Sequence, residues 1–113
     1  MIVRSESHQG VVRLRFDCGE ALDAENAEVV KEDALALIDG SANVVLDLSG
    51  IDLVDSRGLG VLVGLHKAVR EVGRRANFTG VHPEVRRVME LIRLDEIFEV
   101  YPDLGAARRA LDR

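Results

Sequence analysis

Strand-like and helix-like apolar patterns alternate along this chain, and this alternation limits the folds open to it more than any other feature. Residues 11–16 put apolar side chains on one face and two arginines on the other, as in a half-exposed strand. Residues 43–48 are richer in buried residue types and predict a central strand. Residues 76–81 predict a further short strand, and helical patterns lie between these segments. Such an order indicates an α/β layer fold with right-handed crossovers.

Four segments carry the helical period. They are residues 23–39 with Asp23 as the N-cap, residues 57–72, a helix whose first residue is Pro83, and a helix that Pro102 opens and that runs to Leu111. Gly40 and Gly73 follow the first two segments and are expected to end them. Residues 96–100 predict a last short strand, and residues 1–5 an edge strand. We therefore expect a single mixed sheet of four or five strands with about four helices packed against it.

The apolar positions of two helices predict which of their sides face the core. In residues 57–72 the core candidates are Leu59, Leu62, Val63 and Val69. In the helix that begins at Pro83 they are Val85, Val88, Met89 and Ile92. Apolar residues that are exposed in the first turns of residues 57–72 would instead be contacts for a partner.

Length and composition restrict the class of protein. The 113 residues fit one domain, and 47% hydrophobic with 31% charged residues argues against disorder. The sequence has no apolar run long enough to span a membrane, and its N-terminus has no signal-peptide core. Cys18, the one cysteine, can form neither an internal disulfide nor a CxxC metal site. We therefore expect a reduced, soluble, cytoplasmic protein.

Charge is spread unevenly along the chain. The net charge of −5 disfavours nucleic acid as a direct partner. Residues 17–39 hold eight acids and one lysine, whereas residues 57–75 hold five basic residues and one glutamate. This asymmetry suits a protein with an oriented interface, although two solvated helix faces of opposite sign would look the same in the sequence.

Residues 52–60 read Asp-Leu-Val-Asp-Ser-Arg-Gly-Leu-Gly and place a serine between a strand and a helix. Ser56 has two interpretations. As a helix N-cap it would accept a hydrogen bond from a backbone N–H of the first turn, which says little about function. As an exposed residue at a helix N-terminus it can enter a kinase active site, where free N–H groups and the helix dipole would tolerate the added phosphate.

Known catalytic and metal-binding motifs are missing from the sequence. The three histidines are scattered without zinc spacing, and neither a GxxxxGK[ST] nor a GxSxG motif occurs. An enzyme with Asp55 as base and Ser56 as nucleophile is a rival, but adjacent side chains diverge and no third group orients them. We therefore expect a protein that is not an enzyme and holds no cofactor or metal. A deep pocket with convergent polar groups near Ser56 would favour the enzyme.

Residues 44–62 resemble the core signature of STAS domains, and most closely that of the bacterial anti-sigma factor antagonists. Those proteins have a hydrophobic strand, a D-S-[S/T]-G-L-[G/A] turn and an apolar helix. Residues 19–27 are similar to the family's G-x-L-D-x-x-T-A stretch, and residues 80–98 resemble its last strand, helix and strand. The resemblance implies a single STAS domain over residues 1–113, with its core at about 10–111.

This resemblance implies a partner-switching function. The unphosphorylated protein would bind an anti-sigma factor that is also a serine kinase, and would thereby release the sigma factor. Phosphorylation of Ser56 would weaken that complex, and a metal-dependent phosphatase of the PP2C type would restore it. By position, the partner-binding residues would be Asp23, Asp55, Ser56, Arg57, Gly58, Leu59 and Gly60.

The sequence departs from the family pattern at three places. One residue is inserted before Leu22, Asn26 takes the usual place of a threonine, and Arg57 stands where serine or threonine is usual. The Arg57 guanidinium could pair with the phosphate or with an acid of the kinase, or it could mark a changed partner.

Other STAS proteins offer alternative functions. The domain could be a subunit of a lipid-transport ABC complex or a stress-signalling scaffold, in which Ser56 need not be phosphorylated. The intact Asp55–Ser56 pair favours the antagonist. The STAS domain of an anion transporter would be fused to membrane helices, which this sequence lacks.

Overall fold

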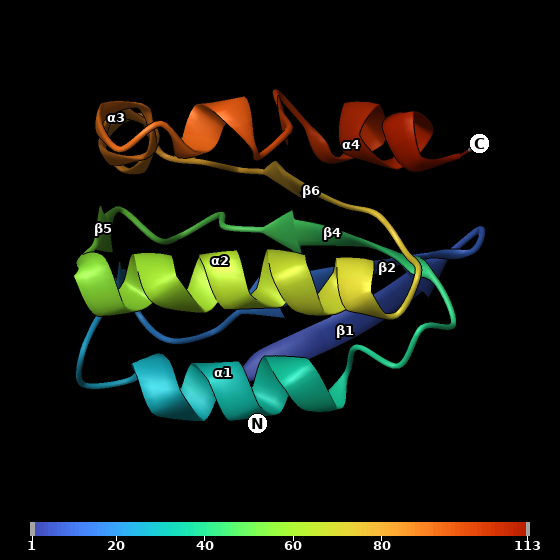
Figure 1. Ribbon diagram of the computed structural model, residues 1–113, viewed down its shortest axis with the longest axis horizontal. Coiled ribbons are helices and arrows are strands. Elements are labelled where there is room, and N and C mark those ends of the chain that lie inside the picture. Colours follow the sequence, from blue (N-terminus) through green and yellow to red (C-terminus); the bar gives the residue numbers. More distant parts are fainter. Residues whose placement is uncertain (1, 113) are drawn as a thin grey trace.

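A five-stranded mixed sheet forms the centre of the computed structural model, which describes residues 2–112 (Figure 1). In spatial order its strands are β1 (Val3–His8), β2 (Val11–Phe16), β4 (Asn43–Asp47), β6 (Ala76–Thr79) and β7 (Val100–Tyr101). β1 pairs antiparallel with β2, and the other three pairs are parallel. The predicted mixed sheet is confirmed.

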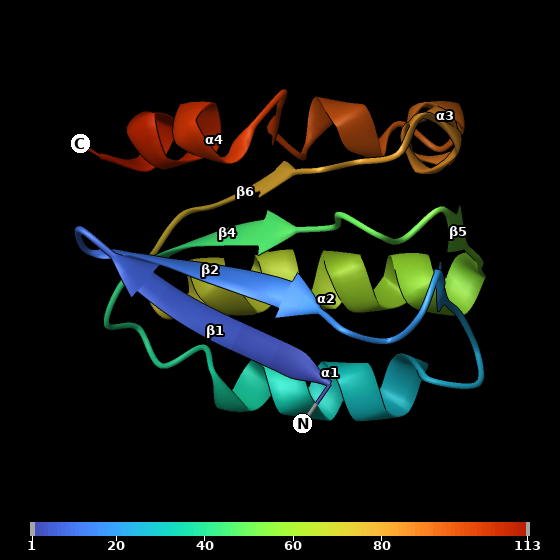
Figure 2. The ribbon, with the colours of Figure 1, turned by 180° about the vertical axis from the view of Figure 1, so that it is seen from behind.

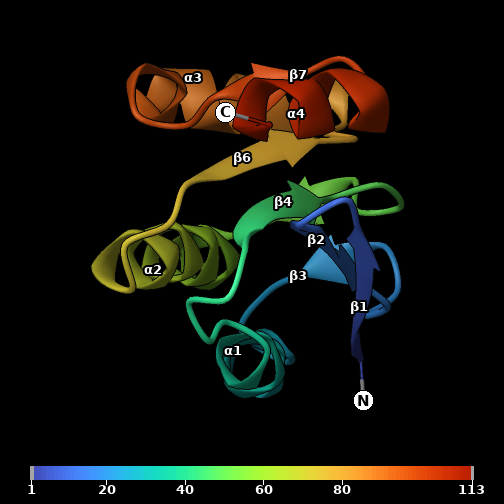
Figure 3. The same ribbon diagram turned by 90° about the vertical axis from the view of Figure 1, so that its right-hand side faces the viewer.

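Helices connect these strands and cover the sheet unequally. They are α1 (Ala27–Ala36), α2 (Ser56–Glu71), α3 (Pro83–Leu91), the 3₁₀ turn η1 (Leu94–Glu96) and α4 (Leu104–Leu111). Figure 3 shows α1 and α2 on the side of the sheet away from α4. A separate parallel pair of two-residue strands, β3 (Ala21–Leu22) and β5 (Leu53–Val54), lies at one end of α2.

Alternate residues of the central strands face opposite sides of the sheet, as the two-residue period requires. Val44 and Leu46 of β4 and Phe78 of β6 point into the main core, together with apolar residues of α1, α2 and α3. Val45 of β4 faces the other side, where it packs with Ala107 of α4. The core therefore has a thick layer under three helices and a small second layer under α4.

A buried carboxylate joins the ends of the central strands. Asp47 is 3% exposed, and its Oδ2 accepts hydrogen bonds from the Arg13 guanidinium at 2.8 and 2.6 Å. Its Oδ1 accepts from the backbone N–H and the hydroxyl of Ser49 at 3.0 and 2.6 Å. Burial alone would raise the pKa of Asp47, but the hydrogen bonds from Ser49 and the Arg13 guanidinium outweigh it and lower that pKa. The carboxylate therefore stays charged inside the fold.

β1 lies at an open edge of the sheet. Only Val3 of this strand is buried, and the other five residues are exposed. Arg4 pairs with Asp17 at 3.0 Å, and Glu6 lies 3.6 Å from the Arg13 guanidinium. Figure 2 shows the β1–β2 hairpin in front of the molecule, where no helix covers it. The predicted edge strand is present but extends further than residue 5, and Met1 lies outside the described residues.

The first helix starts later than the sequence predicts. Asp23 is not its N-cap, because residues 23–26 form a turn and Asn26 directly precedes the helix. The Asn26 side chain accepts from the Asp23 N–H at 3.0 Å and donates to the Ala21 carbonyl at 2.8 Å. These bonds satisfy the backbone in a non-helical conformation. At the other end α1 stops at Ala36, three residues before the predicted limit.

The prediction of a strand over residues 96–100 is also wrong. Arg93 adopts a left-handed conformation with φ 63°, and η1 follows it. The Phe98 N–H donates a hydrogen bond to the Leu94 carbonyl at 2.7 Å, which closes a helical turn. The side chains of Leu94 and Phe98 are both buried, and both belong to this turn. Their spacing of four residues fits one side of a turn better than one face of a strand. β7 is limited to Val100–Tyr101.

Most predicted core residues of α2 and α3 are buried. Two are not, because Val63 is 41% and Ile92 is 52% exposed. Val88 is partly buried, and the fully buried candidates are Leu59, Leu62, Val69, Val85 and Met89. Pro83 is the first residue of α3, as predicted. The strands predicted at 43–48 and 76–81 end one and two residues early.

The burial of α2 predicts a large cost for Leu62→Ala. Leu62 is fully buried, so its truncation leaves a cavity and should lower the free energy of unfolding by about 2–5 kcal/mol. Val63→Ala, on the neighbouring exposed position, is the matched control and should change stability by about 0.5 kcal/mol or less. Urea unfolding of both variants measures the difference, and equal stabilities would contradict the assigned burial.

The lowered pKa of His66 predicts that the protein loses stability in weak acid. Burial, followed by the nearby Arg70 charge, lowers the pKa of His66, while Glu99 opposes this shift. An imidazole whose pKa is lower in the folded state takes up its proton more readily when unfolded, so its stabilising effect is complete above about pH 6.5 and declines below that value. Thermal unfolding between about pH 7.5 and pH 5 should show a smaller decline for His66→Phe than for the wild type. Parallel declines would contradict this assignment.

Candidate functional site

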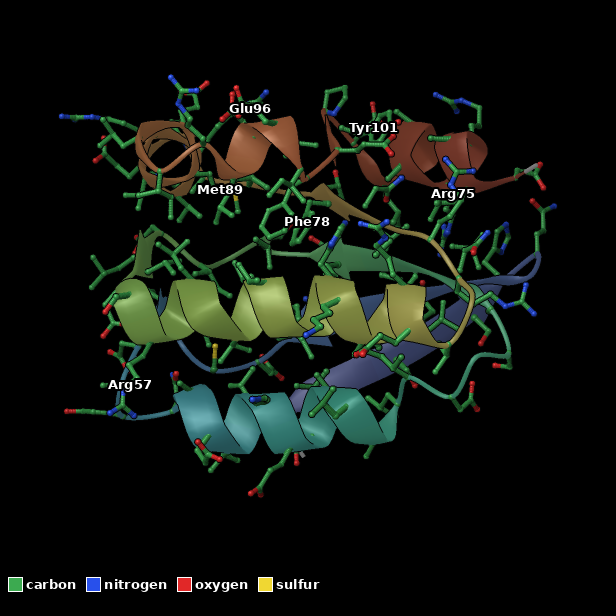
Figure 4. The ribbon with its side chains drawn as sticks, viewed as in Figure 1. Arg57, Arg75, Phe78, Met89, Glu96 and Tyr101 are labelled. Carbon is green, nitrogen blue, oxygen red and sulfur yellow. The ribbon has the colours of Figure 1, made fainter. Side chains whose placement is uncertain are left out.

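Ser56 is the first residue of α2 and is exposed at one end of the molecule, the end where Figure 4 labels Arg57. The residue before it is the N-cap. Asp55 has an extended backbone, and its Oδ1 accepts a hydrogen bond from the Gly58 N–H at 2.9 Å. Of the two interpretations of Ser56, the helix N-cap is therefore wrong. Because Asp55 takes that role, the Ser56 hydroxyl is not used to satisfy the first turn.

The second oxygen of Asp55 holds a distant loop. Its Oδ2 accepts from the Ala24 N–H at 3.0 Å, which links the turn at residues 23–26 to the start of α2. The Gly58 N–H lowers the pKa of Asp55 most strongly, desolvation opposes this shift, and the N–H groups of Ala24 and Arg57 lower the pKa further. A general base near neutral pH needs the opposite shift. This geometry therefore gives no support to Asp55 as the base of an Asp–Ser enzyme.

Gly58 lets the start of α2 lie directly against β3. A Cβ at this position would collide with the Leu22 carbonyl oxygen and would approach the Val54 side chain to 2.9 Å. The same Leu22 carbonyl accepts a hydrogen bond from the Asp55 N–H at 3.4 Å. β3, β5 and the first turn of α2 are therefore packed into one unit, and this unit fixes the direction in which Ser56 projects.

The residues that the sequence predicts as partner-binding fall into two groups. Asp55, Ser56, Arg57 and Gly60 are exposed, whereas Gly58 and Leu59 are buried and Asp23 is half-buried. Asp23 accepts a hydrogen bond from the Glu25 N–H at 3.0 Å and so stabilises its own turn. The buried positions support the exposed ones from below.

Leu53 belongs to the same surface and was missed. It lies on β5, three residues before Ser56, and 60% of it is exposed. The alternation between Leu53 and the buried Val54 was the available signal, because one of two neighbouring strand residues must point outward. Leu53 therefore adds an exposed apolar side chain to the end of the molecule that carries Ser56.

A shallow depression extends this surface between α1 and α2. Its volume is about 230 Å³, and Lys31 of α1 and Arg57 and Gly60 of α2 line it. Nothing lies within 4 Å of the place where a Gly60 Cβ would stand. Gly60 is therefore not needed for packing within the described residues, in contrast to Gly58.

A family model for the STAS domain matches residues 3–107. The chain belongs to the STAS family. Among STAS relatives, the anti-sigma F factor antagonist of Paenibacillus polymyxa is 30% identical over 101 residues, which cover 88% of this chain and 85% of the relative. This match places the chain in the anti-sigma factor antagonist family, so the resemblance drawn from the sequence is confirmed.

Solved STAS structures share the fold. An anti-sigma factor antagonist of Mycobacterium paratuberculosis has a TM-score of 0.84 at 25% identity, over 98% of this chain and 93% of that one. The Bacillus cell fate determinant SpoIIAA, solved in its phosphorylated form, has a TM-score of 0.68 at 19% identity, over 96% and 98% of the two chains. Among the described residues of this STAS protein, no helix is both long and apolar enough to cross a membrane.

The two glycines of the first turns of α2 should respond oppositely to alanine. Gly58→Ala forces a Cβ against the Leu22 carbonyl and should lower the free energy of unfolding by about 1–3 kcal/mol. Gly60→Ala meets open space and should raise it by about 0.5–1 kcal/mol, because alanine restricts the unfolded chain. Urea unfolding measures both, and a stable Gly58→Ala variant would contradict the close approach.

Proposed function

We propose that this protein is an anti-sigma factor antagonist whose binding to an anti-sigma kinase is switched off by phosphorylation of Ser56. The observation that carries the proposal is the exposed, uncommitted Ser56 hydroxyl at the first position of α2, beside an Asp55 that already caps the helix. A kinase can reach such a hydroxyl without unfolding the helix. The membership of the chain in the antagonist family supports the same conclusion.

The charges around Ser56 explain how a phosphate would act. The positive end of the α2 dipole favours a dianion there, so the fold should tolerate it. Asp55 lies next to it, and its carboxylate stays charged because its pKa is lowered. A partner that covers this surface would have to desolvate both negative groups at once, which weakens the complex.

Arg57 adds a positive charge beside these two negative groups. Its exposed guanidinium follows Ser56 directly and can form a charge-assisted hydrogen bond to the phosphate. Such a bond would hold the phosphate on the protein itself and would keep it from a basic group of the kinase. Arg57 is thus the residue in this surface that we expect to set which kinase and which PP2C-type phosphatase recognise the protein.

The exposed residues form a smaller contact surface than the sequence motif predicts. It comprises Leu53, Asp55, Ser56, Arg57 and Gly60, with the depression beside Lys31 as its margin. Leu53 supplies the apolar centre that a stable contact requires. The open space at Gly60 lets a partner side chain approach the backbone of α2.

The proposal predicts three different affinities for the anti-sigma kinases of the source organism. Ser56→Ala should bind like the unmodified protein and accept no phosphate, whereas Ser56→Asp should bind more weakly. Phosphoserine should bind most weakly, because it carries more charge and more acceptor oxygens than aspartate. Calorimetric titration measures the affinities, and mass spectrometry after incubation with ATP and magnesium locates the phosphate.

Thermal unfolding of the phosphorylated protein provides the control. Its melting temperature should be unchanged or slightly raised, so that weaker binding reflects the surface and not a loss of fold. A phosphate found only at other residues, or equal affinities of the modified and unmodified forms, would overturn the phosphorylation switch. That outcome would favour a transport subunit or a scaffold.

A further inference from the structure

A groove lies between the second half of α2 and residues 94–99, on the face of the molecule shown in Figure 4. One half of it, about 430 Å³ in volume, has mainly apolar walls. Val63 and Ile97 stand on its two sides and are 41% and 57% exposed, while Leu94 and Phe98 form deeper walls. We call this space the α2–η1 groove.

The other half of the α2–η1 groove is basic. It has a volume of about 240 Å³, and three arginines, Arg70, Arg74 and Arg75, line it opposite Glu99. His66, Arg70 and Ile97 line both halves, so the two spaces adjoin. The groove therefore changes from apolar to cationic along the direction of α2.

Charge in the groove is opposite to that of the whole chain. Its charged lining residues are Lys67, Arg70, Arg74 and Arg75 against Glu71 and Glu99, which leaves a net charge of 4 − 2 = +2. The complete chain has a net charge of −5. Within residues 2–112 neither Lys67 nor Arg70 forms an ion pair, so both cations remain open to an added anion.

His66 marks the junction of the two halves. It is only 9% exposed, and its ring is held against Phe98 and Phe78 at centroid distances of 5.1 and 6.4 Å. Figure 4 shows Phe78 between α2 and η1. Among the described residues, the His66 ring nitrogens make no hydrogen bond. His66 lines both halves of the groove, so its ring can be reached by a ligand that lies there.

We propose that the α2–η1 groove binds a small anionic amphiphile, a molecule with an apolar chain and one terminal carboxylate. The apolar chain lies between Val63, Ile97 and Phe98, and the carboxylate accepts hydrogen bonds from Arg70 and His66. The volume lies within the range of small-molecule sites, in which apolar walls carry a few converging polar groups.

The dimensions favour a chain of medium length. α2 ends at Glu71, and from Val63 to Arg70 its axis advances by about 10 Å at the rise of an α-helix. This distance joins the apolar walls to the Arg70 cation. A short carboxylate would leave Val63 and Ile97 exposed to water, and an uncharged chain would leave the cations unpaired.

This site lies along α2 from Ser56 and shares no lining residue with the exposed serine surface. The proposal therefore does not depend on the phosphorylation switch, and each can fail without the other.

Decanoate, used below its micelle-forming concentration, is the probe. We expect NMR titration of the full chain to show saturable one-to-one binding, with shifts confined to residues that line the groove. Decanol, which lacks the charge, and acetate, which lacks the chain, are the matched ligands and should each bind at least about tenfold more weakly, a difference of about 1.4 kcal/mol. Equal binding of decanol or of acetate would overturn the proposal.

Amino-acid substitutions distinguish decanoate binding in the groove from its general adsorption to apolar surface. Ile97→Asp and Arg70→Gln alter exposed lining residues and should each weaken decanoate binding at least about fivefold while the melting temperature is preserved. Leu91→Gln removes a leucine that is 73% exposed outside the groove and is the matched control. If Leu91→Gln weakens binding as much as Ile97→Asp does, decanoate adsorbs to apolar surface in general and the site does not exist.

The pKa of His66 distinguishes binding in the groove from general adsorption, because adsorption elsewhere would not change it. A carboxylate against the ring favours the imidazolium form, so decanoate should raise the pKa of His66 in an NMR pH titration. The charged groups near this ring are Arg70, which opposes protonation, and Glu99, which favours it. An unchanged His66 pKa at saturation would contradict the assigned position of the carboxylate. Groove signals that shift with protein concentration alone would show that a second copy covers the groove, and would also overturn the proposal.

Discussion

The close approach of Gly58 to the Leu22 carbonyl determines how the end of the molecule that carries Ser56 is built. No residue with a side chain can take the place of Gly58 without moving β3 or α2. Because the two elements touch there, the Asp55 carboxylate can reach both the Gly58 N–H and the loop at Ala24. Ser56 is then left exposed on a rigid support. The motif glycine and the motif aspartate thus support the start of α2, and Asp55 is itself exposed beside the serine.

Periodicity was sufficient to predict the large elements. Residues 11–16 and the helix after Ser56 have strong local patterns, and both lie where the sequence predicts. β3 and β5 are only two residues long, so they have no period that could be recognised. Their existence depends on the approach of two segments about thirty residues apart. The same is true of η1, which Arg93 starts by adopting a backbone conformation that is uncommon for a side-chain-bearing residue.

The site could be predicted only in part from the sequence, because several of its features depend on contacts between distant residues. The motif located Ser56, because serine beside aspartate at a helix start is a local feature. Whether Asp55 or Ser56 caps α2 depends on Ala24, which is 31 residues away in the chain. The exposure of Val63 and Ile97 likewise depends on how α2 lies beside residues 94–99. The excess of basic residues in 57–75 was visible, but its position along an apolar groove was not.

The exposed strand β1 has a consequence for how this protein can associate. An unpaired strand edge can accept a strand from another molecule, which leads to stacked sheets and aggregation. Here the edge carries Arg4 and Glu6, both exposed and both engaged with charges of the same chain. A further strand would have to cover these charged groups, and the opposite edge, β7, is only two residues long. Growth of the sheet between molecules is therefore opposed at both edges, and the helical surfaces are left as the places for reversible contact.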